Sequence, residues 1–457
     1  ISISSEDTMK KSRAFKSVDS SRRDFVKKSA IAATAMIAGC SPKIAETVRT
    51  TAPATGAVLG ANDRLTIGFI GVGGQGFNAH VGSVRDNADE FNAVGAAVCD
   101  LFDKRRDRAA AAFNLDSSSA YDDYRRVLDR NDLDAVFIGT VDHWHARIAM
   151  DAMESGKHVY CEKPMTRYLD EAFQVHDVAV KTGMKFQVGS QYCTEGKWHK
   201  AAEMIKAGMI GPLVLAQDSY CRNNPDGEWN YEIEPDATPD HIDWDTWLGP
   251  VSDRPFSADH YHRWRKYYPY CAGILGDLLA HRIHPLLLAT GSPEFPVRVT
   301  SLGTRKITTD RDVPDNTQVL AEFPSGLTVM VLGSTVNEQG LEQVIRGHEA
   351  TLYFGGNTVE LRPERPFADL VDREVVENIE PGVSVPAHIN NWFTAIREDK
   401  QPSGNIDLAI KTQTVISLAE MSNRLGEMLY FNEKTRKATT GSGREVPLIT
   451  YGTLELS

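Results

Sequence analysis

Positive charge, cysteine and long apolar runs are all scarce in this chain of 457 residues. The 50 Lys and Arg against 62 Asp and Glu give a net charge of −12, which repels phosphate backbones, so we expect no nucleic-acid partner. The six cysteines include no C-x-x-C pair and indicate neither a zinc site nor a disulfide framework. A single Cys193–Cys221 bridge is conceivable, but nothing in the sequence requires it. No apolar run reaches the roughly 20 residues that span a bilayer.

Residues 21–40 read SRRDFVKKSAIAATAMIAGC and have the pattern of an export signal. Arg22-Arg23 open a match to the twin-arginine motif, and the short apolar run that follows ends at Cys40 in a lipobox-like sequence. We therefore expect export by the twin-arginine route to a periplasmic or membrane-anchored location, with a lipid anchor on Cys40. An uncleaved anchor or an ordinary cleaved signal is the alternative. Met9 is a candidate start of translation. Removing residues 1–39 changes the net charge to about −16.

The rest of the chain predicts a linker and two α/β domains. Residues 41–61 are rich in Thr, Ala, Pro and Gly and predict a tether. From 62 to 188, apolar strands alternate with helices, which predicts a doubly wound parallel sheet, a Rossmann domain. From 189 to 457, strand-like runs follow one another with short turns, which favours a second domain with a largely antiparallel open sheet. Two late helices, near 387–398 and 406–424, are expected to pack back onto the body.

A glycine motif follows the first predicted strand, 65–70. Residues 71–76 read GVGGQG, in which glycines permit a tight turn, a close approach of backbone to a pyrophosphate, and close packing of helix on strand. The next strand ends at Asp100, whose carboxylate suits both ribose hydroxyls and repels a 2′-phosphate. NAD is therefore favoured over NADP, although Lys104 and Arg105 lie near. The expected cofactor contacts here are Gly71, Gly73, Gly74, Gln75, Gly76 and Asp100.

Two polar loops follow later strands, at the sheet edge where doubly wound folds bind ligands. One reads Thr140-Val141-Asp142-His143-Trp144-His145, and the other Glu162-Lys163-Pro164, whose X-Pro bond is a candidate for the cis form. Much later, Asp277, His281 and His284 are spaced to share one face of a helix. Spacing alone does not distinguish a catalytic face from structural histidines.

The ordered set of GVGGQG, Asp100, the 140–145 loop, Glu162-Lys163-Pro164 and the later D-x-x-x-H helix resembles the Gfo/Idh/MocA superfamily of oxidoreductases, over about residues 65–427. The resemblance implies a Rossmann domain, a C-terminal α/β domain that forms homodimers or homotetramers, and a nicotinamide site. It further implies that Lys163, Asp277 and His281 line the cleft beside the nicotinamide, with Glu162 near its ribose. Thr140 and His145 belong to the same cofactor-binding set.

The sequence departs from this family pattern at three places. Val141 replaces a usual proline, Ala272-Gly273 replaces a double glycine, and His284 stands where an aspartate is common. The last position is expected to meet substrate hydroxyls, so substrate identity is the expectation that the departures weaken most. They also leave open a metal ion held by Asp277, His281 and His284, although no further ligand is evident and we predict no metal site.

The expected chemistry is oxidation of a secondary alcohol, which needs a base for the hydroxyl proton. His281 is the candidate base, oriented by Asp277, and Lys163 would stabilise the developing alkoxide, although Lys163 is an alternative base. In the aromatic segment 229–270, ordinary packing explains most residues, and Trp264 and Arg265 are the candidate contacts to a sugar.

Three functions fit these residues. The first is an exported NAD(P)-dependent enzyme that oxidises a hydroxyl of a sugar or polyol. The second is a redox-neutral glycosidase, in which oxidation, elimination, water addition and reduction regenerate NAD at every turnover. NAD is scarce outside the cytoplasm, so an exported enzyme of either kind needs a tightly bound cofactor. The third is a non-catalytic carbohydrate-binding module, which the Lys163, Asp277 and His281 set disfavours.

Overall fold

The computed structural model describes residues 63–451. The predicted export signal with Cys40 and most of the predicted linker therefore lie outside the described residues. Between residues 63 and 451, every helix is too short or too polar to cross a bilayer. The five cysteines of this part are free thiols, so the conceivable Cys193–Cys221 bridge is not formed.

The first sheet is parallel throughout and has the strand order β3-β2-β1-β4-β5-β6. This order confirms the predicted doubly wound fold. Its strands are β1 (Leu65–Ile70), β2 (Ala93–Cys99), β3 (Ala120–Tyr121), β4 (Ala135–Ile138), β5 (His158–Glu162) and β6 (Phe186–Gly189). A π-helical turn (Gly76–Val81) precedes α2 (Gly82–Asp86), and the other helices are α3 (Ala88–Phe91), α4 (Asp103–Ala112), α5 (Tyr124–Leu128), α6 (Asp142–Glu154) and α7 (Leu169–Thr182).

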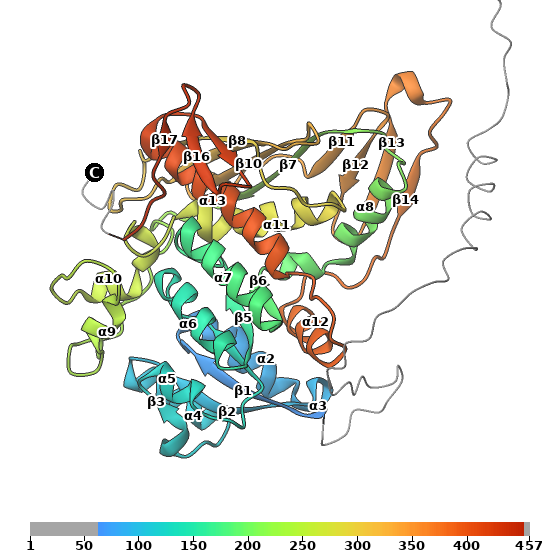
Figure 1. The fold of residues 1–457 in the computed structure, drawn as a ribbon. Coiled ribbons are helices and arrows are strands. Elements are labelled where there is room, and N and C mark those ends of the chain that lie inside the picture. Colours follow the sequence, from blue (N-terminus) through green and yellow to red (C-terminus); the bar gives the residue numbers. More distant parts are fainter. Residues whose placement is uncertain (1–62, 452–457) are drawn as a thin grey trace, which may run out of the picture. The chain divides into compact units, whose positions relative to one another are not determined.

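The two faces of this sheet are covered by different parts of the chain. On one face, Phe69 and Phe137 pack with Trp392 and Phe393 of α12 (Val385–Arg397). The other face packs against α6 and α7 and is continuous with the core of the second sheet. Helix α12 therefore covers a sheet that ends about 200 residues earlier in the sequence, as Figure 1 shows.

The second sheet has eleven strands and is antiparallel except where β7 pairs with β10. In spatial order the strands are β14 (Glu374–Val376), β13 (Val359–Pro363), β12 (Ala350–Phe354), β11 (Val344–Gly347), β7 (Leu213–Cys221), β10 (Thr328–Ser334), β9 (Asn316–Glu322), β8 (Arg298–Thr304), β15 (Leu429–Asn432), β16 (Lys437–Thr440) and β17 (Glu445–Val446). Helices α8 (Gly196–Lys206), α11 (Ala280–Ala289) and α13 (Ile406–Leu425) lie between this sheet and the first one (Figure 1). The predicted second architecture is confirmed.

The aromatic segment between β7 and α11 reaches across to the first sheet. It contains α9 (Trp244–Leu248) and α10 (Ala258–His262). Trp244 and Trp247 stack with ring centroids 4.7 Å apart and belong to a buried cluster with Phe102 and Val141. A β-bridge joins Phe102 to Ile242. As expected, most aromatic residues of this segment form a core, and that core fixes the segment over the carboxyl ends of β2 and β4.

Candidate active site

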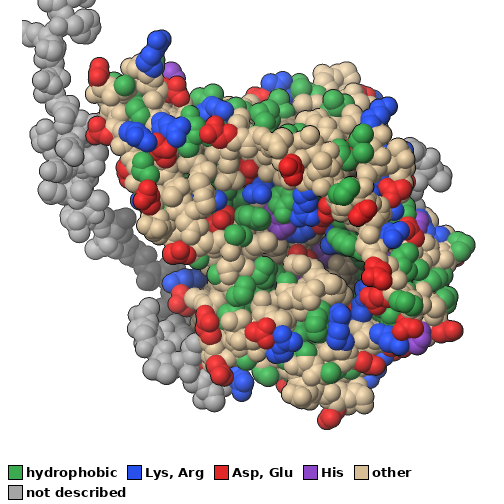
Figure 2. All heavy atoms as spheres, turned by 180° about the vertical axis from the view of Figure 1, so that it is seen from behind, with side chains coloured by type: hydrophobic (Ala, Val, Ile, Leu, Met, Phe, Trp, Pro, Cys, Tyr) green, Lys and Arg blue, Asp and Glu red, His purple; other side chains and the backbone are tan. Residues whose placement is uncertain are grey.

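A cavity of about 1090 Å³, part of it open to solvent, lies at the carboxyl ends of the parallel strands. Its lining combines the loops after β1, β2, β4 and β5 with residues 246–265 of the aromatic segment. The face in Figure 2 is hollowed across its middle, with Lys, Arg and His side chains inside the hollow.

The glycine turn at one end of the cavity has no room for side chains at its tight positions. Gly71 has φ of +80°, and a Cβ there would lie 2.5 Å from the backbone nitrogen of Thr140. A Cβ on Gly76 would lie 2.0 Å from the carbonyl oxygen of Gly71. Gly74 instead faces open space, with nothing within 4 Å of an added Cβ. The turn therefore offers bare backbone and a helix start to the cavity, which fits a dinucleotide pyrophosphate.

Asp100 is buried at the end of β2, where a ribose is expected. Its Oδ2 accepts a hydrogen bond from the Val72 amide (2.8 Å) and its Oδ1 from the Phe102 amide (2.9 Å). Burial raises the pKa of Asp100, while the Arg105 charge and these two backbone bonds oppose that rise. The two neighbouring cations are both ion-paired with the aromatic segment, Arg105 with Glu234 (2.7 Å) and Lys104 with Asp236 (2.9 Å).

Glu162, at the end of β5, is oriented by the glycine-turn helix. Its Oε1 bonds His80 Nε2 at 2.9 Å and accepts a longer bond from Gln75 Nε2 at 3.2 Å. Burial alone would raise the pKa of Glu162, but the His80 bond and the Lys163 charge outweigh it and lower the pKa to about 2. Gly189 leaves the space that this carboxylate occupies. Glu162 is thus a fixed anion beside the middle of the cavity.

Lys163 and Asp277 meet across the two halves of the molecule. The predicted cis bond at Lys163–Pro164 is present. Lys163 Nζ donates to Asp277 Oδ1 at 2.5 Å and to the Asp277 carbonyl at 2.9 Å. Arg265 Nε donates to the same Oδ1 at 2.9 Å, and Trp229 Nε1 donates to Oδ2 at 3.0 Å. Burial would raise the pKa of Asp277, but these two cations lower it far below its usual range.

His281 lies one turn beyond Asp277 and next to two tyrosines. Its ring centroid is 5.4 Å from that of Tyr192 and 6.1 Å from that of Tyr220. Burial lowers the pKa of His281 well below its usual value, so the ring is neutral near pH 7. Its Nδ1 has no hydrogen-bond partner within residues 63–451.

His284 does not line the cavity, and neither Asp277 nor His281 is among its lining residues. The Nδ1 of His284 bonds the Ala280 carbonyl at 2.7 Å, and the residue is 1% exposed. Asp277, His281 and His284 would share one face of a regular α-helix, but Leu275–Leu279, which includes Asp277, forms a π-helical turn that changes the angle between residues. Across residues 63–451 no three His, Cys, Asp or Glu side chains are grouped to hold a metal ion. A site of Asp277, His281 and His284 is therefore not formed.

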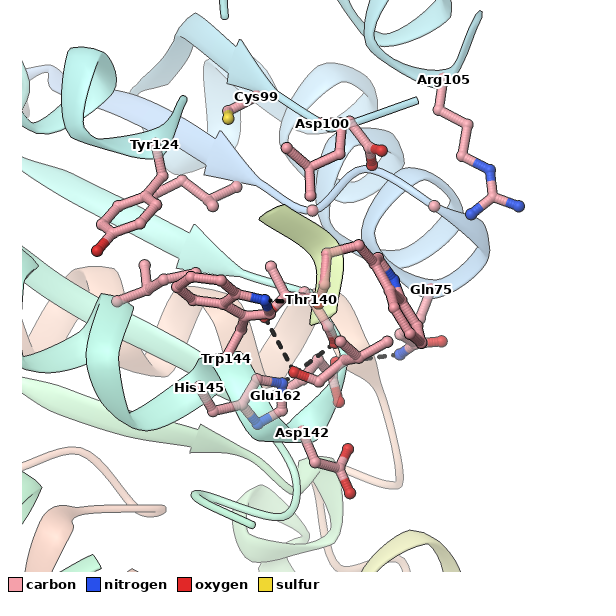
Figure 3. A pocket seen from close by; sticks show the side chains of 18 of the residues that line it. Gln75, Cys99, Asp100, Arg105, Tyr124, Thr140, Asp142, Trp144, His145 and Glu162 are labelled. Carbon is pink, nitrogen blue, oxygen red and sulfur yellow. Dashed lines mark hydrogen bonds between the residues drawn. The ribbon is translucent and has the colours of Figure 1, made fainter. Parts of the chain in front are cut away.

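The remaining predicted residues line the cavity between these two ends. Thr140, His145, Trp264 and Arg265 all do so. His145 links the two polar loops, because its Nδ1 is 2.8 Å from the Pro164 carbonyl and its Nε2 is 3.2 Å from the Thr140 carbonyl. The Arg265 guanidinium lies 4.1 Å from the centroid of the Trp264 ring. Figure 3 shows Asp100 and Arg105 at one end of the site and Asp142 at the other.

Two domain models of one protein family match most of the chain. The model for an oxidoreductase family with an NAD-binding Rossmann fold matches residues 65–190, and the model for that family's C-terminal α/β domain matches residues 199–445. This protein is a member of the Gfo/Idh/MocA oxidoreductase family. The predicted NAD-binding domain is thereby confirmed, and the bare glycine turn and Asp100 are the residues that fit the cofactor.

Two curated proteins resemble part of the chain. A glycosyl hydrolase family 109 protein of Shewanella baltica is 31% identical over 214 residues, covering 44% of this chain and 45% of that protein. An alpha-N-acetylgalactosaminidase of Shewanella oneidensis is 32% identical over 164 residues, covering 34% and 35%. The chain thus matches less than half the length of these curated relatives.

Solved structures share the fold at lower identity. Levoglucosan dehydrogenase in complex with NADH and levoglucosan has a TM-score of 0.62 at 20% identity, covering 80% of this chain and 99% of that one. Aldose-aldose oxidoreductase from Caulobacter crescentus has a TM-score of 0.61 at 17% identity, covering 80% and 100%.

Sequence reasoning did not single out three residues of the site. Trp229 and His80 act through the carboxylates of Asp277 and Glu162, and no local pattern marks either of them. Asp142 stands inside the polar 140–145 loop and lines the cavity. Its signal was available, because it follows a parallel strand at the ligand-binding edge.

Proposed function

We propose that this protein oxidises a hydroxyl group of a sugar or sugar derivative by hydride transfer. The observation that carries the proposal is the Lys163–Asp277 contact of 2.5 Å, which places an ammonium group at one end of a cavity whose other end is the bare glycine turn. NAD, when bound, supplies the hydride acceptor. Asp100 and the glycine turn would hold its adenosine end, and Glu162, Thr140 and His145 its middle.

The chain's own groups are suited to handling the hydroxyl proton. His281 is neutral near pH 7 because burial lowers its pKa, so the imidazole can accept a proton; its Nδ1 is enclosed, which leaves Nε2 as the nitrogen for this role. Lys163 is the alternative base, and as a cation it stabilises negative charge on the same oxygen. Asp277 stays ionised and fixes the position of Lys163 and Arg265. Trp264 offers a flat apolar face for the C–H face of a sugar ring.

A redox-neutral glycosidase is the second candidate, and the names of the curated relatives favour it. In that reaction the oxidised sugar loses its leaving group by elimination and gains water. The cofactor would then have to stay bound through every turnover. The ion pairs of Arg105 and Lys104 with Glu234 and Asp236 hold the aromatic segment over the adenosine end, which supports such retention and supports NAD over NADP.

A deuterium-transfer experiment tests the oxidation. Sugars carrying deuterium on a single hydroxyl-bearing carbon are mixed with the purified enzyme for a single turnover. The mass of the extracted cofactor is then measured by mass spectrometry. Deuterium on the nicotinamide identifies the oxidised carbon and supports the proposal. If no labelled position of any sugar that binds transfers deuterium, the protein is a binding module.

Export, lipid anchoring and self-association belong to the same proposal. The segment 21–40 supports twin-arginine export to the periplasm with Cys40 as the lipidated residue, and the family membership supports a homodimer or homotetramer. Mass spectrometry of the mature protein from its host should find a diacylglyceryl group on residue 40. A Cys40→Ala variant that remains in the membrane fraction would contradict the anchor.

A further inference from the structure

Asp142 is a buried carboxyl of the cavity that neither the cofactor nor the hydride step uses. It is the first residue of α6, is 3% exposed, and lines the same cavity as Lys163 and Arg265. Within residues 63–451 its carboxyl forms no hydrogen bond, and its oxygens are not among the fully enclosed polar atoms. Figure 3 shows it at the end of the site away from Asp100 and Arg105. An unpaired buried carboxyl is costly unless it is neutral or has a ligand.

The charges around Asp142 give it a different protonation state from its neighbour Asp277. The nearby cations Lys163 and Arg265 both bond Asp277 Oδ1, so Asp277 is the carboxyl that compensates them. Burial raises the pKa of Asp142 to about 8, with Asp277 raising it further and Arg265, Lys163 and Arg167 opposing the rise. One site thus holds an ionised and a neutral carboxyl, which is the usual division between an electrostatic partner and a proton donor.

Other carboxyls that line the cavity are unsuited to donating a proton. Glu162 is ionised and bonded to His80 and Gln75. Asp100 accepts two backbone amides at the far end. Asp123 accepts the Arg125 amide as the N-cap of α5. Among the carboxyls of the cavity lining, Asp142 therefore has the position and the free oxygens that a catalytic acid needs.

We propose that Asp142 is the catalytic acid that protonates the leaving oxygen of a glycoside, which rests on the glycosidase form of the proposed function. A base of this site removes the proton from the carbon beside the sugar carbonyl, and that electron pair forms a C=C bond. The bond from the neighbouring carbon to the glycosidic oxygen breaks, and the oxygen takes the proton of Asp142. Water then adds its oxygen to the same carbon and returns a proton to Asp142. The base gives its proton back to the carbon beside the carbonyl, and the carbonyl regains the hydride removed at the start, so the net reaction is hydrolysis.

A plain dehydrogenase has no leaving group to protonate, so this residue also bears on which reaction the cavity serves. Removing a general acid lowers the rate about 10²–10⁴-fold when the leaving oxygen is strongly basic. It matters little when the leaving group is an acidic phenol that departs unprotonated. The signature of Asp142 is therefore a change in leaving-group dependence rather than a uniform loss.

The test compares Asp142→Asn with wild type on two glycosides of one sugar. A panel of 4-nitrophenyl glycosides selects the sugar, and its methyl glycoside is the second substrate. We expect the variant to lose about 10²–10⁴-fold with the methyl glycoside and less than about 10-fold with the nitrophenyl one, with Asp142→Glu intermediate. Asp107→Asn is the control, because Asp107 is an exposed carboxyl of α4 that does not line the cavity. It should change neither rate.

A second readout does not depend on turnover. Infrared difference spectra of the holoenzyme should contain the C=O stretch of a protonated carboxyl that Asp142→Asn lacks, while both proteins hold equal amounts of NAD. Equal loss on both glycosides, no loss on either, or no such band would overturn the acid role alone. If the wild-type enzyme releases no aglycone from any glycoside, the glycosidase form of the function fails and the acid role fails with it.

Discussion

The two ends of the cavity differ in what faces a ligand: backbone at one end and side chains at the other. Around the glycine turn the ligand-facing surface is backbone, and its shape depends on side chains that are missing at Gly71 and Gly76. Around Lys163 the site depends on side chains from four separate segments, because Asp277 joins Lys163, Arg265 and Trp229. The first end can bind the common part of a cofactor in any such enzyme. On the proposed function, the second end is the one that selects the substrate and reacts with it.

Removing the central cation of the reacting end should have the largest effect. Lys163→Ala leaves Asp277 paired with Arg265, so the fold should persist, but charge on the substrate oxygen is no longer stabilised. Turnover should fall at least about 10³-fold while the amount of NAD bound stays the same. His281→Ala should act similarly. Lys434→Ala, which changes an exposed lysine in the turn between β15 and β16, is the control. Activity retained in both active-site variants would refute the site assignment.

Adding one methyl group to the glycine turn should lower both the stability of the protein and its binding of NAD. In Gly76→Ala the new Cβ meets the Gly71 carbonyl at 2.0 Å, and backbone on both sides prevents relaxation. We expect a loss of about 1–3 kcal/mol of stability, measured by denaturant unfolding, together with loss of NAD. Gly74→Ala is matched to it, because nothing lies within 4 Å of its Cβ. Equal stability of the two variants would contradict the described turn.

These two ends also differ in how far the sequence predicts them. Residues 71–76 are contiguous, and a strand, a glycine turn and Asp100 suffice to place the cofactor. The reacting end requires residues 162–163, 229, 265 and 277 to meet, and no local pattern sets their distances. The buried position of His284 has a local cause, since a π-helical turn at Leu275–Leu279 cannot be predicted from D-x-x-x-H spacing. The contact between α12 and the first sheet likewise could not be predicted from hydrophobic periodicity.

A smaller change should separate the two cofactors. Asp100→Ala removes the ribose carboxylate and should weaken NAD about tenfold, a free-energy change of about 1.4 kcal/mol, while NADP is affected less. Because Asp100 also accepts the Val72 and Phe102 amides, the NAD to NADP affinity ratio is the diagnostic quantity, measured by calorimetry. Asp103→Ala, whose carboxylate bonds His241, should leave that ratio unchanged. An unchanged ratio in Asp100→Ala would remove this residue from the ribose site.

The pH profile should show the smallest but most specific contrast. Burial lowers the pKa of His281, so its neutral form persists below the ordinary value of about 6.5 and the rate should not fall on acidification through that pH. Asp142 is neutral below about 8, so glycoside cleavage should decline above it while reduction of bound NAD by a free sugar does not. The charged groups facing His281 are Lys163, Asp277, Glu162 and Arg282. An acidic limb near 6.5 would contradict a neutral, buried His281.

The most direct measurement uses residues 41–457, purified with whatever cofactor they retain and given none. Chromogenic glycosides and free sugars are added in turn, and aglycone release and the absorbance of reduced nicotinamide are followed together. We predict reduced cofactor in proportion to enzyme with a sugar that the protein oxidises. Aglycone release over many turnovers without net reduced cofactor would identify the glycosidase form of the function. Retained NAD with neither signal, across sugars that demonstrably bind, would contradict oxidation of a sugar hydroxyl by this protein.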